Sequence, residues 1–375
     1  MLLRDMSSYY FIRNLFLPGK GASVNETRAS ETKWIDLAII RKEYFQLKYK
    51  GVFVFEEIMP RLYRIIIPLP NSPLKELNSY VIKADDRNLI IDTGFNRRVC
   101  FEAMQGGLRA LDIDLSKTDF MLTHMHADHT GLISRLVTDT SAVYFSRIDA
   151  RVFDKNINWQ PMIDYAVSNG FQMEDLIKAL KSHPGIKYSP KNIPEFNLID
   201  DGSIIQIGDY RLQCLLTPGH TEGHICLYDE NKQILFSGDH VLYDITPHIE
   251  SWSYEVNSLK NYLESLDRVR NLPVNIVLPG HRNFFTDLKG RIDELKKHHQ
   301  NRVNEVLEVL GISTMSAYDI AAGMTWDIDC ESWEQFPIAQ KWFATGEAIA
   351  HLLYLEGEGR VKRNTGKKII TFSAY

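Results

Sequence analysis

The chain has little cysteine, and its four cysteines lie far apart in the sequence. Cys100, Cys214, Cys226 and Cys330 form no C-x-x-C pair, so the pattern favours neither a disulfide-bonded scaffold nor a zinc ribbon. Because disulfides are typical of oxidising compartments, we expect this chain to be cytoplasmic.

Long apolar runs and a strong net charge are also missing. No stretch reaches the roughly 18 apolar residues that a membrane-spanning helix requires, so we expect no membrane span. The formal net charge is −5 over 375 residues, which argues against a surface dominated by binding to nucleic acid or acidic lipid. The remaining composition, with 44% hydrophobic and 24% charged residues, is that of a soluble globular protein with a substantial core.

The order of patterns predicts three segments. Within residues 1–50, the stretch 19–34 is polar and contains glycine and serine. We therefore expect residues 1–50 to be an N-terminal extension that acts as a subunit arm, a lid or a surface anchor; a subunit arm would imply a homodimer. Residues 51–286 contain short β-rich runs and three helical patterns, and residues 287–375 contain helical patterns followed by a basic hairpin, in the order of a winged helix. The β-rich runs lie at 52–58, 62–70, 79–84, 88–94, 119–124, 142–146, 203–209, 211–219, 224–230, 233–239 and 274–282, and the helical patterns of the first part lie at 97–111, 129–137 and 151–185.

One short stretch, THMHADHTG at 123–131, concentrates side chains that bind metals. His124 and His126 alternate at the end of a predicted strand and can face the same way, while Asp128 and His129 follow where a helix should begin. Imidazole and carboxylate groups suit zinc, iron or manganese. A polar surface loop is the alternative interpretation, but four such residues at this spacing favour two ligands to each of two adjacent metals.

Three later stretches repeat the same arrangement of a strand, a small residue and a residue that can bind a metal. His220 and His224 lie in TPGHTEGH, Asp239 lies in FSGDH, and His281 lies in LPGHR. Loops at strand ends are positions at which a rigid sheet commonly presents functional residues. The sequence therefore predicts that these loops meet at one site.

Taken in order, IDTG, HMHADH, GHTEGH, SGD and PGHR resemble the motifs of the metallo-β-lactamase superfamily of hydrolases, over residues 52–283. The resemblance implies an α/β fold, an αββα sandwich, with a dinuclear metal site at one edge. It also implies that Asp92 of IDTG orients ligands without binding metal. The implied ligands are His124, His126 and His220 for the first metal, Asp128, His129 and His281 for the second, and Asp239 as the bridge between them.

The chain departs from several branches of this superfamily. Glu222 stands where glyoxalase II-like members often have proline. Asp239 stands where the best-known zinc β-lactamases have cysteine, which argues against penicillin-type substrates. His126 stands where flavodiiron oxygen reductases have glutamate, which argues against an oxygen-reducing site.

The resemblance implies a dinuclear hydrolase in which two divalent metal ions hold a bridging hydroxide and polarise the substrate. Asp128 and Asp239 are the expected catalytic residues, with Asp128 also able to pass a proton to the leaving group. The expected substrate is a small-molecule ester, thioester or lactone. Zinc is the favoured metal, and the ligand set also tolerates iron or manganese.

Two histidines are candidates for contact with the substrate. His224 follows the predicted ligand His220, and a buried structural role is an equal alternative. His248 lies in the loop after Asp239, where the alternative is an ordinary solvated residue.

The basic hairpin gives the main alternative function, a metal-dependent ribonuclease or phosphodiesterase. This tail resembles the C-terminal winged-helix-like domain of superfamily members, some of which act on RNA. The alternative interpretation is a solvated hairpin that balances Glu356 and Glu358. A non-catalytic binding module is disfavoured, because the seven predicted ligands leave open positions on two metals, whereas structural zinc sites are closed. The basic residues of the hairpin are Arg360, Lys362, Arg363, Lys367 and Lys368.

Overall fold

The computed structural model describes residues 55–154 and 158–375 of the chain. The predicted extension at 1–50 lies outside the described residues, as do the first three positions of the predicted strand at 52–58. Residues Phe53–Tyr375 form one compact unit.

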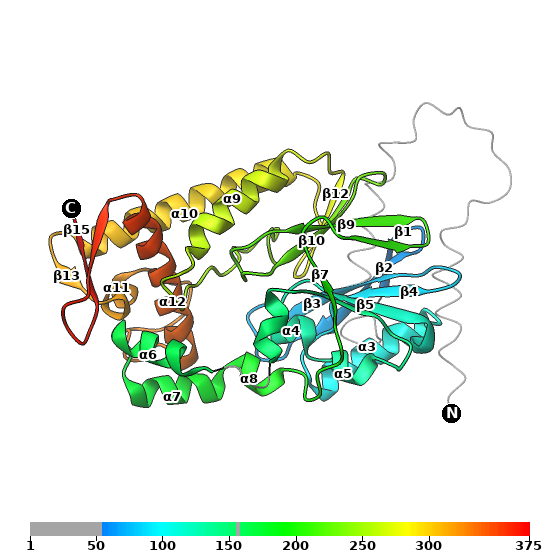
Figure 1. Ribbon diagram of the computed structural model, residues 1–375, viewed down its shortest axis with the longest axis horizontal. Coiled ribbons are helices and arrows are strands. Elements are labelled where there is room, and N and C mark those ends of the chain that lie inside the picture. The colour runs from blue at the N-terminus through cyan, green and yellow to red at the C-terminus, as the bar shows by residue number, and fades with distance from the viewer. Residues whose placement is uncertain (1–54, 155–157) are drawn as a thin grey trace. The chain divides into compact units, whose positions relative to one another are not determined.

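The first sheet contains seven strands in chain order (Figure 1). The strands are β1 Phe55–Met59, β2 Leu62–Pro68, β3 Glu76–Ile82, β4 Asn88–Ile91, β5 Thr118–Leu122, β6 Val143–Ser146 and β7 Asn197–Ile199. The strands from β1 to β4 pair antiparallel, whereas those from β4 to β7 pair parallel. Parallel strands end at the same edge of a sheet, so the loops that follow β4, β5 and β6 lie together.

The second sheet contains five strands in the order β12-β11-β10-β9-β8. Their bounds are β8 Ile204–Ile207, β9 Tyr210–Leu216, β10 Ile225–Asp229, β11 Ile234–Gly238 and β12 Ile276–Pro279. Strands β11 and β12 pair parallel, and the other neighbours pair antiparallel. The loops after β11 and β12 therefore also share an edge.

The two sheets pack face to face, and helices cover both outer faces (Figure 1). Tyr80 and Met121 of the first sheet pack against Phe236 of the second in the central layer. Helix α3 (Arg98–Ala110) buries Met104 and Leu108, which are four residues apart and therefore on one face, against the first sheet. Helix α9 (Ser258–Arg270) and helix α10 (Leu288–Leu310) cover the second sheet. This is the predicted αββα sandwich.

The stretch predicted to be helical at 151–185 contains α6 Gln160–Ser168 and α7 Met173–Ser182, and α8 Pro184–Tyr188 begins at its end. Phe171 and Leu176 pack against Trp342 of helix α12 (Ile338–Gly357), so this insertion contacts the C-terminal helices. The shorter helical turns are η1 Leu115–Lys117, α4 Ala127–Thr130, α5 Ile133–Leu136 and η2 Asp149–Phe153.

A helical C-terminal region follows the sandwich. Helix α10 ends at Leu310, and the capping residue Gly311 adopts a positive φ of 49°. The remaining elements are α11 Ala317–Gly323, α12, and a small sheet in the order β13-β15-β14, formed by β13 Thr314–Met315, β14 Val361–Asn364 and β15 Thr371–Ala374. The winged-helix assignment and the boundary at residue 286 stay predictions. None of the helices in the described parts of the chain has both the length and the apolar character that crossing a membrane requires.

Candidate metal centre

All seven predicted ligands lie close to strand ends, and the fold brings them together. The segment after β5 carries four of them, with His124 and His126 in a loop and Asp128 and His129 in the short helix α4. The loops after β9, β11 and β12 carry the other three, His220, Asp239 and His281, from the second sheet. The site is therefore assembled across the sandwich.

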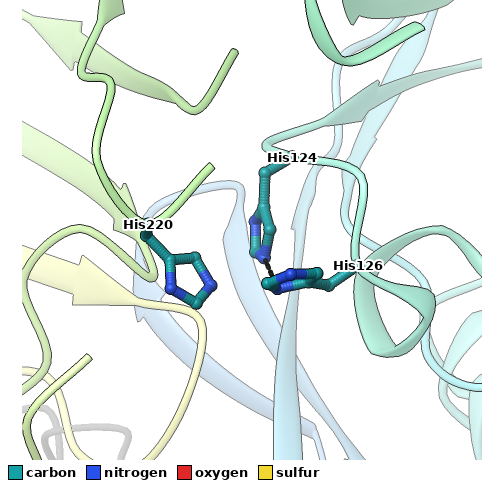
Figure 2. A group of neighbouring side chains, drawn as sticks. All are labelled: His124, His126 and His220. Atoms are coloured by element: carbon teal, nitrogen blue, oxygen red, sulfur yellow. Dashed lines mark hydrogen bonds between the residues drawn. The ribbon is translucent and has the colours of Figure 1, made fainter. Parts of the chain in front are cut away.

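The first group of ligand atoms comes from His124, His126 and His220. Its ligand atoms all lie within 4.8 Å of one another. The Nε2 atom of His124 is 3.1 Å from Nδ1 of His126. Figure 2 shows these two rings side by side, with the His220 ring facing them from a separate loop. Three imidazoles converging on one point form the donor set of a metal-binding site.

The second group comes from Asp128, His129 and His281, whose ligand atoms also lie within 4.8 Å of one another. The Nε2 atoms of His129 and His281 are 3.3 Å apart, and Nε2 of His281 is 3.4 Å from Oδ2 of Asp128. This group joins one carboxylate to two imidazoles and is therefore the more negative of the two.

Asp239 lies between the two groups. Its Oδ2 atom is 3.7 Å from Nε2 of His220 in the first group and 3.3 Å from Nε2 of His281 in the second. Its Oδ1 atom is 3.5 Å from Nε2 of His129. One carboxylate therefore contacts both groups, as a bridging ligand must.

Five of the seven candidate ligands are histidines, and in four of them the Nδ1 atom contacts another group of the protein. Nδ1 of His124 lies 3.0 Å from the Thr123 hydroxyl, and Nδ1 of His129 lies 2.7 Å from Asp92. Nδ1 of His220 and of His281 each lie 2.7 Å from a backbone carbonyl, those of His248 and Glu76 respectively. Because a proton held at Nδ1 leaves Nε2 unprotonated in a neutral ring, these contacts favour Nε2 as the atom that would bind a metal.

The three histidines of the first group have lowered pKa values, which favour neutral imidazole rings. Burial lowers the pKa of His124 well below its usual value, and the neighbouring imidazoles lower it further. Burial also lowers the pKa of His126, to about 3, and that of His220. Three neutral imidazoles have lone pairs available for a cation.

The second group attracts positive charge. Burial alone would lower the pKa of His281, but Asp239 and Asp128 outweigh it and raise the pKa to about 10. Asp92, Asp239 and Asp128 hold the pKa of His129 well above its usual value in the same way, against the effect of burial. The buried carboxylates thus require positive charge at this position, which a divalent cation supplies.

The residues present fit a pair of metal ions. Nε2 of His220 is buried and has no hydrogen-bond partner among the described residues, although this atom faces the first group. A buried polar atom without a partner is costly, and a bound cation would satisfy it. The donor set of imidazoles and carboxylates is one that zinc, iron and manganese all accept.

Close packing of the backbone positions the second-sheet ligands. A Cβ atom at Gly280 would lie 2.5 Å from Oδ1 of Asp239 and 2.8 Å from Cε1 of His129, so only glycine fits there. Strand β3 secures the preceding residue, because Tyr80 donates a hydrogen bond of 2.7 Å from its hydroxyl to the Pro279 carbonyl. The loop that carries His281 is thereby fixed to the first sheet.

Asp92 is hydrogen-bonded to the segment that carries the candidate ligands of the first sheet. It is 2% exposed and accepts hydrogen bonds of 2.8 Å from the Thr123 backbone N–H and from the Thr123 hydroxyl. With the His129 contact, its carboxylate receives three donors from the ligand loop. Its backbone φ is 60°, a left-handed conformation that aspartate tolerates at a tight turn.

The two predicted substrate contacts have different surroundings. His224 has no exposed surface; its Nδ1 is 2.8 Å from the Thr217 hydroxyl, and its Nε2 accepts the Asp239 backbone N–H at 3.0 Å. Both of its nitrogens are engaged within the chain, which favours the buried structural role. The His248 side chain is 30% exposed and lies 3.4 Å from both Glu250 and Glu347.

Sequence reasoning missed two carboxylates around the site. Asp149 follows β6, and Glu347 lies in α12 beside His248. Neither residue gives a signal in the sequence. Asp149 stands alone after β6 without a neighbouring histidine, and Glu347 is one of many charged helical residues.

Comparisons with known proteins identify the family. Residues 76–281 match the family model of the metallo-beta-lactamase superfamily, and residues 333–375 match that of the metallo-beta-lactamase-like C-terminal domain. The first match covers more than half of the chain. The chain therefore belongs to the metallo-beta-lactamase superfamily, as the sequence motifs predict.

Individual relatives agree with this assignment. A probable metallo-hydrolase of Bacillus subtilis is 28% identical over 78% of this chain and 92% of its own length. An atrochrysone carboxyl ACP thioesterase of a Cryptosporiopsis species is 25% identical over 68% of this chain and 64% of its own length. The chain spans 61% and 65% of the lactamase-like proteins that it matches in Aspergillus fumigatus and Aspergillus niger.

A solved structure shares the fold over most of the chain. The crystal structure of a metallo-beta-lactamase family protein from Thermus thermophilus superposes with a TM-score of 0.72 at 27% identity. The match covers 85% of this chain and 100% of that one. The similarity therefore extends beyond the sandwich into the C-terminal region.

Proposed function

We propose that the chain is a dinuclear metal-dependent hydrolase that acts on an ester, thioester or lactone of a small molecule. The observation that carries the proposal is the position of Asp239, which contacts both groups of ligand atoms. A single structural metal would need neither the second group nor a shared carboxylate.

The proposed ligands are His124, His126 and His220 for one cation, Asp128, His129 and His281 for the other, and Asp239 for both. When bound, the two cations supply the Lewis acidity that polarises an acyl carbonyl and acidifies water. We propose zinc as the metal, because imidazoles with few carboxylates suit it, and iron or manganese as alternatives.

Asp128 and Asp239 are the proposed catalytic carboxylates. Asp239 is 4% exposed and is fixed from its backbone by His224, which accepts its N–H. Asp128 is 8% exposed, and its Oδ2 atom points at His281. We propose that His224 positions Asp239 and does not contact the substrate.

His248 is the proposed substrate contact. Its ring is partly exposed, and it packs against Phe343 with ring centroids 5.4 Å apart. Burial alone would lower the pKa of His248, but Glu250 and Glu347 outweigh it and raise the pKa to about 10. A charged donor beside the centre suits the oxygen-rich groups of an acyl substrate.

Two observations support a small acyl substrate over RNA. One relative is named as a thioesterase. In the basic hairpin, Arg363 is not available as a free cation, because it lies 3.1 Å from Glu356 and stacks over the ring of Tyr254. We therefore do not propose RNA as the substrate, and the hydrolysis panel described next includes an RNA to check this.

Elemental analysis of the purified protein, paired with a hydrolysis panel, tests the proposal. The panel contains thioesters, lactones, aryl esters, phosphodiesters and a structured RNA, with Asp239→Ala as the test variant. Asp244→Ala is the matched control, because Asp244 is exposed in the same loop. We expect about two metal ions per chain and acyl hydrolysis that only Asp239→Ala abolishes. Protein without metal, or turnover retained in Asp239→Ala, would contradict the proposal, and cleavage of RNA alone would replace the substrate class.

A further inference from the structure

A buried carboxylate outside the predicted ligand set lies between the two loops that form the first ligand group. Asp149 begins the helical turn η2 directly after β6 and is 3% exposed. No other carboxylate side chain contacts both of these loops in the hydrogen bonds of residues 55–154 and 158–375. Asp149 therefore links the two loops that carry the first ligand group.

Asp149 accepts hydrogen bonds from both loops. Its Oδ2 atom accepts the Met125 backbone N–H at 2.9 Å and the Thr221 hydroxyl at 2.7 Å, and its Oδ1 atom accepts the Gly223 backbone N–H at 2.7 Å. Three donors converging on one side chain need two acceptor oxygens, which a carboxylate provides and an asparagine does not.

The donors are the immediate neighbours of the first ligand group. Met125 lies between His124 and His126, and Thr221 follows His220. A displacement of either donor would therefore move a ligand of the first group relative to the others. Hydrogen bonds around metal ligands orient the ligands, so the loss of such a bond lowers metal affinity.

The backbone at Gly223 is shaped to allow this contact. A Cβ atom there would lie 2.6 Å from Oδ1 of Asp149, 2.6 Å from the Asp149 backbone nitrogen and 2.6 Å from Oγ of Ser146. Only glycine permits such an approach. The sequence thus contains both halves of the contact, the carboxylate and the residue that makes room for it.

We propose that Asp149 is a positioning residue that clamps the loop of His124 and His126 to the loop of His220, and so sets the geometry of the first metal site. The inference rests on the proposed function, because it assumes that this group binds a cation. Burial raises the pKa of the Asp149 carboxyl to about 6, while the hydrogen bonds from Thr221, Gly223 and Met125 oppose this rise. The chain accommodates a buried acid here at a cost that an apolar residue would avoid.

Zinc titration of metal-free protein against a competing chelator tests the inference. The titrations use a His281→Ala background, which leaves only the first group complete. We expect Asp149→Asn to weaken zinc binding by about 10- to 100-fold, as loss of a hydrogen-bonding support to a ligand typically does. Asp114→Asn is the matched control, because Asp114 also accepts a backbone N–H and a hydroxyl but is exposed before β5.

A pair of variants at Thr221 distinguishes an effect on the position of the ligands from an effect on folding. Thr221→Val removes only the hydroxyl donor and should weaken zinc binding, whereas Thr221→Ser retains the hydroxyl and should restore it. This pair also keeps the test valid if Asp149→Asn does not fold. Unchanged zinc affinity in Thr221→Val and in folded Asp149→Asn would overturn the inference while leaving the proposed function intact. Absence of zinc binding in the unmodified chain would overturn the proposed function, and the inference with it.

Discussion

Replacing Asp92 with asparagine should change which nitrogen of His129 carries the proton. In the native chain, the Asp92 carboxylate accepts from Nδ1 of His129 at 2.7 Å, so Nε2 is free to bind a metal. Asparagine has the same shape, but one of its oxygens becomes an NH2 group that can only donate. Because the Thr123 backbone N–H occupies the remaining oxygen, the NH2 group would face Nδ1 of His129. The imidazole would then accept at Nδ1 and hold its proton at Nε2, the atom aimed at Asp239.

The expected loss follows from this geometry. A change in the group that supports a ligand typically costs about 10- to 100-fold in metal affinity. That range corresponds to roughly 1.4 to 2.8 kcal/mol of binding free energy. We expect the loss at the group of Asp128, His129 and His281, and a smaller change at the group of His124, His126 and His220, because Asp92 touches only His129 among the ligands directly.

The assay is zinc titration of metal-free protein, with the His129 tautomer followed by nitrogen-15 chemical shifts. Asp229→Asn is the matched control, because Asp229 has no exposed surface and accepts the backbone N–H groups of Arg211 and Lys232 away from the site. The control should lose stability but retain both metals. If Asp92→Asn bound two zinc ions with native affinity and kept the proton of His129 on Nδ1, the reasoning would be refuted.

Three further outcomes are expected. Gly280→Ala should fold but lose metal, because its Cβ would lie 2.5 Å from Oδ1 of Asp239; unchanged metal content by elemental analysis would contradict this. Burial lowers the pKa of His299 well below its usual value, so the unfolded chain binds more protons below about pH 6.5 and stability should fall as the pH drops through that value. In His299→Leu this fall should shrink in denaturant titrations between pH 7 and 5, and an unchanged slope would count against it. The free energy of unfolding should be about 2.7 kcal/mol lower in the presence of a chelator than in the presence of free zinc at 100 times its Kd. Identical melting curves in the two conditions would show that no metal binds the folded state.

The sandwich and the meeting of the candidate ligands at one site could be predicted from the sequence, because both depend on short patterns. His124, His126, Asp128 and His129 lie within six positions, and the strands show local alternation or apolar runs. Strand β7 (Asn197–Ile199) and helix α9 are among the elements that were not predicted. Strand β7 is three residues long, with two of them exposed, so it has no apolar run to detect. Helix α9 carries its core residues among many charged ones, and its assignment depends on packing against the second sheet.

The support around the ligands was not predictable because it depends on contacts between distant residues. Asp149 bonds to residues that are 24, 72 and 74 positions away along the chain. A single aspartate after a strand has no local pattern that distinguishes it from a solvated one. Only the packing of β6 beside β5, with the second sheet opposite, brings its three donors together.

The C-terminal helices are connected to the candidate site by a continuous series of polar contacts. Arg302 of α10 donates from Nε to Glu347 of α12 at 3.0 Å, and Glu347 lies 3.4 Å from the His248 ring. The backbone carbonyl of His248 in turn accepts from Nδ1 of His220 at 2.7 Å. The candidate ligand His220 therefore contacts the backbone of His248, and the His248 side chain contacts Glu347, a residue of a helix much later in the chain. The C-terminal region thus contacts the candidate centre as well as the core, and these contacts come from residues outside the motifs that carry the candidate ligands.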